Sequence, residues 1–324
     1  MKTKPFRFVS SLSLACFLAL GMSSTAHAQF GGLGGLGNKV LKKTPTVGGL
    51  LEGKPPITTS LADAVWGDPS KDGFTPREPL RSLLTLQRTP NGGFILQAGY
   101  YSLKSQSYCL HAGTHGPGGG DGYLYAPTKG PAEDAVMTIV RNSVQHPEIQ
   151  QQNIQTLLWA IIARAKFENL SSENRAVAAR LLTPRQIASL NRSALDMVPG
   201  PVLDRAMSSV PAPIRQVMQA EASLRQMLTT PGTPYDQLER VSVLAGMAPM
   251  GEGSRDVPTG RWSLHPDGYY IRYIPSGYTN TVVQVWVPQG SPAVGIEYDP
   301  VTHMAVPGNT SRQRLLMSGR QRMP

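Results

Sequence analysis

The sequence contains little cysteine and little charge, and it has no long hydrophobic run beyond its N-terminal region. Cys16 and Cys109 are the two cysteines among 324 residues, and so few exclude a scaffold held together by several disulfides. Charged residues make up 16% of the chain, which is below average usage. After residue 28 no apolar stretch has the length needed to cross a bilayer, and we therefore expect no transmembrane anchor.

The N-terminus predicts a cleaved secretory signal. Residues 1–7 are basic, residues 8–22 are apolar, and Ala26-His27-Ala28 forms a cleavage site of small residues before Gln29. We expect cleavage after Ala28 and a mature protein that is secreted or periplasmic. Cleavage removes Cys16, so Cys109 becomes the single thiol of the mature chain, in a compartment that oxidises thiols. Such a thiol is buried and idle, bonded to another molecule, or reactive.

The mature chain is moderately basic. Residues 1–28 carry Lys2, Lys4 and Arg7 and no acidic residue, so their removal lowers the formal net charge from +10 to +7. This charge favours an acidic surface, a polysaccharide or an anionic membrane face as partner. The arginines are scattered along the chain and the compartment is wrong for nucleic acid, so nucleic-acid binding is not expected.

The composition and the order of patterns predict an α+β protein rich in loops. Gly (33) and Pro (28) together make up about a fifth of the residues, well above average usage. The expected fold is a strand-rich cysteine domain with a buried helix that carries a glutamine, followed by a helical middle region and a small C-terminal β module. The expected boundaries are a flexible Gly/Pro-rich leader at 29–60, the α+β domain at 61–170, the helical region at 171–250, the β module at 255–310 and a basic tail at 311–324.

Cys109 is predicted to lie on or just after a strand. Residues 82–86 and 93–97 are strand-like and flank a turn signal, and residues 99–103 and 107–110 continue the β pattern. The glycine-rich segment that follows, residues 113–123, lacks the Lys-Ser/Thr pair of a phosphate loop. It is better explained as a loop that lets the backbone approach another element closely.

Two helices are predicted after that loop, over residues 131–145 and residues 150–167. In the second helix, apolar residues recur with helical period. Gln155 shares a face with Trp159 and Ile162. A glutamine beside such a pair is expected to be at least partly buried.

An unpaired cysteine and a glutamine on a rigid apolar element can together form an internal thioester. A thiolate attacks the side-chain amide of the glutamine, ammonia leaves, and the acyl group survives where apolar and aromatic walls exclude water. An arriving amine or hydroxyl then takes over the acyl group and becomes covalently attached. Cys109 beside Tyr108, Gln155 near Trp159 and the glycine-rich loop between them supply the elements that this chemistry requires.

Tyr108-Cys109-Leu110 and Gln155-Thr156-Leu157-Leu158-Trp159 resemble two motifs of the bacterial thioester domains at the tips of surface adhesins and pili. Those domains carry an aromatic-Cys-aliphatic motif and, downstream, a Thr-Gln-x-Ala-Ile-Trp motif. Here Ile154 stands in place of the threonine. The resemblance covers residues 80–170 only.

The resemblance implies that Cys109 and Gln155 are the bond-forming pair. It implies covalent or adhesive attachment at the cell envelope, to a protein or glycan partner with a free amine or hydroxyl. In this interpretation His111 assists aminolysis, and Trp159 and Tyr108 wall the site. No cofactor and no metal are expected.

A secreted cysteine hydrolase or acyltransferase is the second hypothesis. Cys109 would act as a nucleophile activated by a nearby histidine, because a thiol needs a base or a lowered pKa to react. If the strand continued past Cys109, His111 at i+2 would lie on the same face. The candidate bases are His111, His115 and His146, the candidate orienting acids are Asp121 and Asp134, and the candidate oxyanion donors are Gln97 and Gln106.

A non-catalytic envelope binding protein is the third hypothesis. Its expected β module is rich in aromatic side chains that could bind glycans or peptides if they were exposed in pairs. These residues are Trp262, Tyr269, Tyr270, Tyr273 and Trp286. The histidines do not have the spacing of a metal site, since His111 and His115 flank glycines and no further ligand accompanies them.

Overall fold

The computed structural model describes residues 55–57, 60–65, 67–196, 200–208 and 210–321. The predicted signal sequence with Cys16, and most of the predicted leader at 29–60, lie outside the described residues. Within the part that is described, no helix has both the length and the apolar character required to cross a membrane. The structure combines helices and strands, which confirms the mixed α and β composition.

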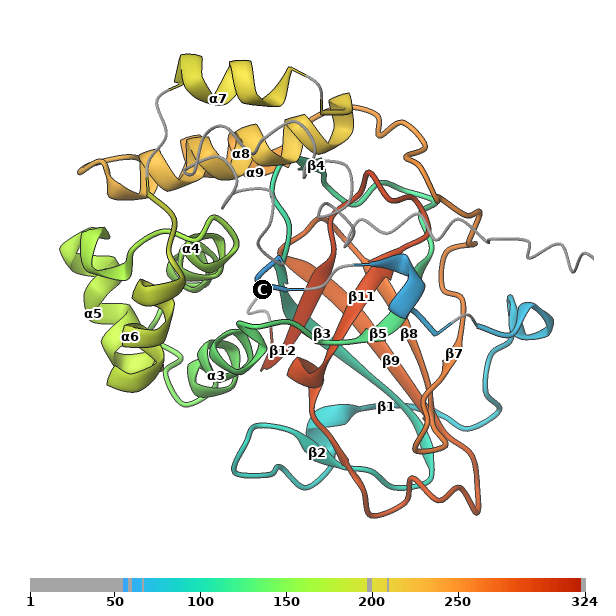
Figure 1. Ribbon diagram of the computed structural model, residues 1–324. Coiled ribbons are helices and arrows are strands. Elements are labelled where there is room, and N and C mark those ends of the chain that lie inside the picture. Colours follow the sequence, from blue (N-terminus) through green and yellow to red (C-terminus); the bar gives the residue numbers. More distant parts are fainter. Residues whose placement is uncertain (1–54, 58–59, 66, 197–199, 209, 322–324) are drawn as a thin grey trace, which may run out of the picture.

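The fold is centred on the long strand β3 (Gly99–Cys109), which belongs to an eight-stranded sheet (Figure 1). Along the sheet the order is β5-β11-β12-β3-β9-β8-β7, and β1 pairs with β3 in parallel. The other strands of this sheet are β1 (Leu80–Ser82), β5 (Tyr123–Pro127), β7 (Ser263–Leu264), β8 (Tyr270–Pro275), β9 (Asn280–Val287), β11 (His303–Pro307) and β12 (Leu315–Gln321).

Two short strand pairs lie outside this sheet. β2 (Phe94–Ile95) pairs with β10 (Glu297–Tyr298), and β4 (Thr114–His115) pairs with β6 (Val243–Leu244). The predicted strand at 82–86 is wrong beyond Ser82. The Ser82 side chain accepts a hydrogen bond from the Leu84 backbone and caps a 3-10 turn. Serine side chains commonly end an extended segment through such a bond to the nearby backbone.

The C-terminal strands do not form a separate module. β9 pairs with β3 from Gly99 to Gln106, and β8 pairs with β9. The predicted basic tail at 311–324 is also wrong as far as residue 321, because β12 lies between β11 and β3 and its first residues are buried. Residues from near both ends of the described chain therefore build one sheet, a pairing between distant segments that local patterns do not encode.

The helices are α3 (Glu133–Ser143), α4 (Gln151–Ile162), α5 (Ser172–Leu181), α6 (Pro184–Ser193), α7 (Gly200–Met207), α8 (Ala212–Thr229) and α9 (Tyr235–Ser242). Helices α3 to α6 lie on one side of the sheet and α7 to α9 lie near one end of it (Figure 1). Short 3-10 turns occur at Leu61–Asp63, Pro69–Lys71, Leu83–Thr85, Phe167–Asn169 and Pro300–Thr302.

Helix α4 lies in the middle of the molecule. It packs against β3 and against α3, α5, α8 and α9. Every residue from Ile154 to Ile162 is buried, as expected for a helix that is apolar nearly all round. The helix ends earlier than predicted because Arg164 adopts a positive φ of 53°, a conformation that a helix cannot continue. This central position places Gln155 inside the protein.

The glycine-rich loop after β3 allows close packing, as predicted. At Gly113, with φ of +67°, a Cβ atom would lie 2.7 Å from the Cβ of Ala220 in α8. At Gly122 a Cβ atom would lie 2.2 Å from the carbonyl oxygen of Val257. The absence of side chains at these two positions lets the loop pass between α8 and the segment that leads into the C-terminal strands.

Candidate functional site

At the end of β3, β12 pairs with one edge, and the other edge is completed by side chains of α4 rather than by another strand. The pairing of β9 with β3 stops at Gln106, and Ser107 donates its backbone N–H to the Thr279 carbonyl at 3.1 Å. At the same two residues, the Gln151 Nε2 of α4 donates to the carbonyl oxygens of Ser107 (3.1 Å) and Thr279 (2.7 Å). A buried backbone group needs a partner, and the helix supplies it here.

Gln155 continues this arrangement one helical turn later. Its Oε1 accepts a hydrogen bond from the backbone N–H of Cys109 at 2.8 Å, and its Nε2 donates to the Cys109 carbonyl at 3.1 Å. Residues four apart share one helix face, so Gln151 and Gln155 reach the same edge of β3. The structure thus brings together the two residues that the sequence singled out.

The pair is enclosed. The side chain of Cys109 is fully buried and its thiol is free, and Gln155 is only 1% exposed. Burial raises the pKa of the Cys109 thiol well above its usual value, and the nearby Glu239 carboxylate raises this pKa further. The thiol is therefore protonated at neutral pH, which is the opposite of the low-pKa thiolate that attacks external substrates in cysteine enzymes.

Aromatic side chains wall the site on one side. Trp159 is fully buried and stacks on Tyr235, with ring centroids 5.4 Å apart and an interplanar angle of 27°. Its ring centroid lies 6.5 Å from that of Tyr278. Tyr108 is also buried, but its hydroxyl donates to the Gln106 Oε1 at 3.0 Å. Neighbouring residues of a strand point to opposite faces, so Tyr108 supports the sheet face opposite to that of Cys109.

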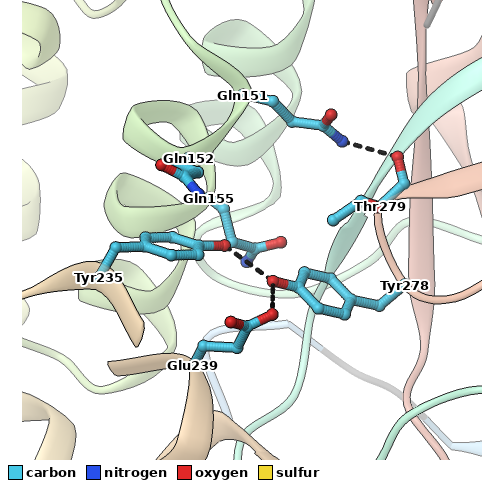
Figure 2. A pocket seen from close by; sticks show the side chains of 7 residues that line it. All are labelled: Gln151, Gln152, Gln155, Tyr235, Glu239, Tyr278 and Thr279. Carbon is cyan, nitrogen blue, oxygen red and sulfur yellow. Dashed lines mark hydrogen bonds between the residues drawn. The ribbon is translucent and has the colours of Figure 1, made fainter. Parts of the chain in front are cut away.

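A pocket of about 240 Å³ opens beside the Gln155 amide. Figure 2 shows that side chains from α4, α9 and the turn between β8 and β9 converge on it. The hydroxyl groups of Tyr235 and Tyr278 form a hydrogen bond, with their oxygens 3.0 Å apart. The Tyr278 hydroxyl donates a further hydrogen bond to a carboxylate oxygen of Glu239. The lining residues are Gln151, Gln152, Gln155, Tyr235, Glu239, Tyr278 and Thr279.

His111 does not occupy the place that a continuing strand would give it. β3 ends at Cys109, so the i+2 relation no longer sets a shared face. The Nδ1 of His111 is buried without a hydrogen-bond partner in the described part of the chain. Burial, with a contribution from the Arg314 charge, lowers the pKa of His111 to about 3. His111 is a neutral imidazole and is not among the residues that line the pocket.

Most of the remaining residues of the hydrolase hypothesis have other partners. His146 contacts Glu148 at 3.2 Å, Asp121 pairs with Arg312 at 2.9 Å, and Asp134 accepts from Gln186 at 2.7 Å. Gln97 is exposed, Gln106 accepts from Tyr108, and His115 lies on β4. The described residues therefore contain no hydrogen-bonded Cys-His-Asp arrangement around Cys109.

The aromatic residues of the binding-protein hypothesis divide into two groups. Trp262, Tyr269 and Tyr273 are buried in the core. Tyr270 and Trp286 are half-buried and stack with centroids 4.9 Å apart. This pair occupies the surface of β8 and β9, and it does not line the pocket beside Gln155.

Comparison with known proteins does not indicate a function for this chain. No model of a known protein family matches the chain, and no curated protein and no solved structure matches it. Within the described ranges, no group of three or more His, Cys, Asp or Glu side chains is placed to hold a metal ion.

Apart from Gln155, the residues that line the pocket were not predicted from the sequence. Gln151 could have been found, because it precedes Gln155 by one helical turn. Tyr235, Glu239 and Tyr278 could not, because nothing local connects a residue of α9 with one in the turn between β8 and β9. Only the folded chain shows that these three side chains meet beside Gln155.

Proposed function

We propose that Cys109 and Gln155 form an internal thioester through which this protein attaches covalently to a partner bearing an amine or hydroxyl. The observation that carries this proposal is the docking of the Gln155 amide onto the backbone of Cys109 in a buried site. We further propose that the mature protein acts in the periplasm or outside the cell, at the cell envelope.

The hydrogen bonds of Gln155 suit the bond-forming step. The Cys109 sulfur attacks Cδ of Gln155, a carbon–sulfur bond forms, and the carbon–nitrogen bond to Nε2 breaks. The thiol proton leaves with that nitrogen as ammonia. Negative charge develops on Oε1 during the attack, and the Cys109 N–H already donates to this oxygen at 2.8 Å. A donor fixed in advance at a developing oxyanion is a large contribution to catalysis.

The surroundings favour an intramolecular reaction over a hydrolase. Attack within one folded site needs no encounter with an external substrate, so a thiol with a raised pKa can react slowly once and still give a complete product. Burial of Cys109 and Trp159, and of all but 1% of Gln155, limits the access of water to the product, as a thioester requires.

Methylamine provides the test of this function. We expect incubation with methylamine to place one methyl group on the amide nitrogen of residue 155, because the amine displaces the Cys109 sulfur. Peptide mapping by tandem mass spectrometry locates the label. The Cys109→Ala variant, which has no sulfur to form the bond, is expected to remain unlabelled.

Gln151 supplies the matched control. It lies on the same helix face and hydrogen-bonds the same strand, but its amide binds the carbonyls of Ser107 and Thr279 rather than the backbone of Cys109. It should carry no label, and the Gln151→Glu variant should still label at Gln155. Labelling of Gln155 in Cys109→Ala to the same extent as in the wild type, or no labelling in the wild type, would contradict the proposal.

A further inference from the structure

The pocket beside Gln155 has a chemistry that the thioester alone does not explain. A carboxylate and two tyrosine hydroxyls converge in it, and the backbone edge of β3 needs none of these groups. Glu239 and both tyrosines are half-buried, so an incoming group can reach them from solvent. Gln155 is the member of the Cys109–Gln155 pair that lines this pocket, and its Cδ is the atom that an acceptor must attack.

We propose that this pocket binds the acceptor as an unbranched primary ammonium group, such as a lysine side chain, and that Glu239 takes its proton. The inference rests on the proposed thioester and names the class of partner. A carboxylate attracts a cation, and the tyrosine hydroxyl oxygens can accept hydrogen bonds from it. A sugar hydroxyl would bring no positive charge to these groups.

Glu239 accepts the last hydrogen bond in a series that runs from Tyr235 through Tyr278. Burial is the main cause that raises the pKa values of Tyr235 and Tyr278, so both hydroxyls keep their protons. Tyr278 donates to Glu239, and its single proton is then used. Tyr235 must therefore donate to Tyr278. This series of hydrogen bonds fixes the carboxylate beside the pocket while the second carboxylate oxygen stays available for an ammonium proton.

The pocket is large enough for an alkylammonium chain. Its volume is about 240 Å³, and Gln152, which also lines it, is exposed. This volume admits a sugar ring as well, so the choice of an ammonium group rests on the charge of Glu239.

The proposed step is balanced. The ammonium group gives one proton to Glu239 and becomes a neutral amine, whose nitrogen attacks Cδ of Gln155. A carbon–nitrogen bond forms, the carbon–sulfur bond breaks, and the second proton of the nitrogen passes to the Cys109 sulfur. Glu239 afterwards releases its proton to water. The products are an amide that joins the two proteins and a free thiol, so no oxidant or further reactant is needed.

The test compares two nucleophiles on the Glu239→Gln variant. Methylamine is a cation near neutral pH and must lose a proton before it attacks, whereas hydroxylamine is neutral there. We expect the variant to lose on the order of 100-fold in its rate of reaction with methylamine, and to keep its rate with hydroxylamine within about threefold. Time-resolved intact mass spectrometry follows both reactions and also records whether the thioester was present at the start.

Two further variants keep the test decisive. Tyr278→Phe removes the hydroxyl that orders Glu239 and should slow methylamine selectively, by a smaller factor. His111→Ala should change neither rate. Equal losses with both nucleophiles, unchanged rates in Glu239→Gln, or a selective loss in His111→Ala would overturn the assignment of Glu239. Loss of the thioester in Glu239→Gln alone would place Glu239 in bond formation instead, and a wild type without thioester would overturn the proposed function itself.

Discussion

Replacing Gln155 with leucine is expected to lower the free energy of unfolding by about 2–6 kcal/mol. The substitution leaves the N–H and the carbonyl of Cys109 buried without partners, and each unsatisfied buried group costs about 1–3 kcal/mol. Equilibrium urea denaturation measures the loss. The comparison is made in the Cys109→Ala background, where no thioester can form, so that the hydrogen bonds alone are removed.

Gln151→Leu in the same background is the matched control. Gln151 is half-buried and donates only through Nε2, so water can replace part of what its amide provides. We expect its loss to be less than half that of Gln155→Leu. A loss for Gln155→Leu that equals or falls below that of Gln151→Leu would show that the amide of Gln155 does not complete the edge of β3.

Trp159→Ala is expected to destabilise the protein by about 3–5 kcal/mol, because it removes a fully buried aromatic ring and leaves a cavity. Trp159→Phe should cost much less. The indole Nε1 of Trp159 is buried without a hydrogen-bond partner among the described residues, so phenylalanine loses no hydrogen bond and keeps a ring against Tyr235. Thermal and urea denaturation of both variants provide the comparison.

The same two variants report on the shielding of the thioester. Trp159→Ala should shorten the lifetime of the bond in water, whereas Trp159→Phe should leave it nearly unchanged, because the ring that excludes water is still present. If Trp159→Phe cost as much stability as Trp159→Ala, the indole nitrogen would be making an essential contact, contrary to this account.

The local features of the site could be predicted from the sequence. The alternating pattern up to Cys109 is that of a strand, and β3 ends at this residue. The helical period around Gln155 is that of a buried helix, and α4 is buried from Ile154 to Ile162. These patterns depend on neighbouring residues, which determine whether a segment is extended or helical and which of its faces is apolar.

The distant features could not be predicted. Residues 311–324 were expected to form a solvated tail because they are basic, yet the Arg314 side chain is only 1% exposed. Its Nη1 donates to the carbonyl oxygens of Thr310 and Arg312, each at 2.7 Å, so the backbone around it satisfies the charge. Composition gives the charge of a segment, but whether nearby carbonyls accept from that charge depends on how the chain folds.

The pocket shows the same limit at the site. It joins α4, α9 and the turn between β8 and β9, three segments separated by long stretches of chain. Gln155 was identified because its helix pattern is local, whereas Glu239 and Tyr278 are adjacent only after β8 and β9 join the sheet of β3. The error of treating residues 255–310 as a separate module therefore also concealed the side of the pocket that Tyr278 and Thr279 form.

The intact mass of the freshly purified mature protein, prepared without amine buffers, tests the central claim most directly. The account predicts a wild type that is lighter than its sequence by one ammonia, and a Cys109→Ala variant at its full sequence mass. A wild type at full mass, whose Cys109 thiol is alkylated once the protein is unfolded, would contradict the thioester and leave Gln155 as the residue that completes the edge of β3.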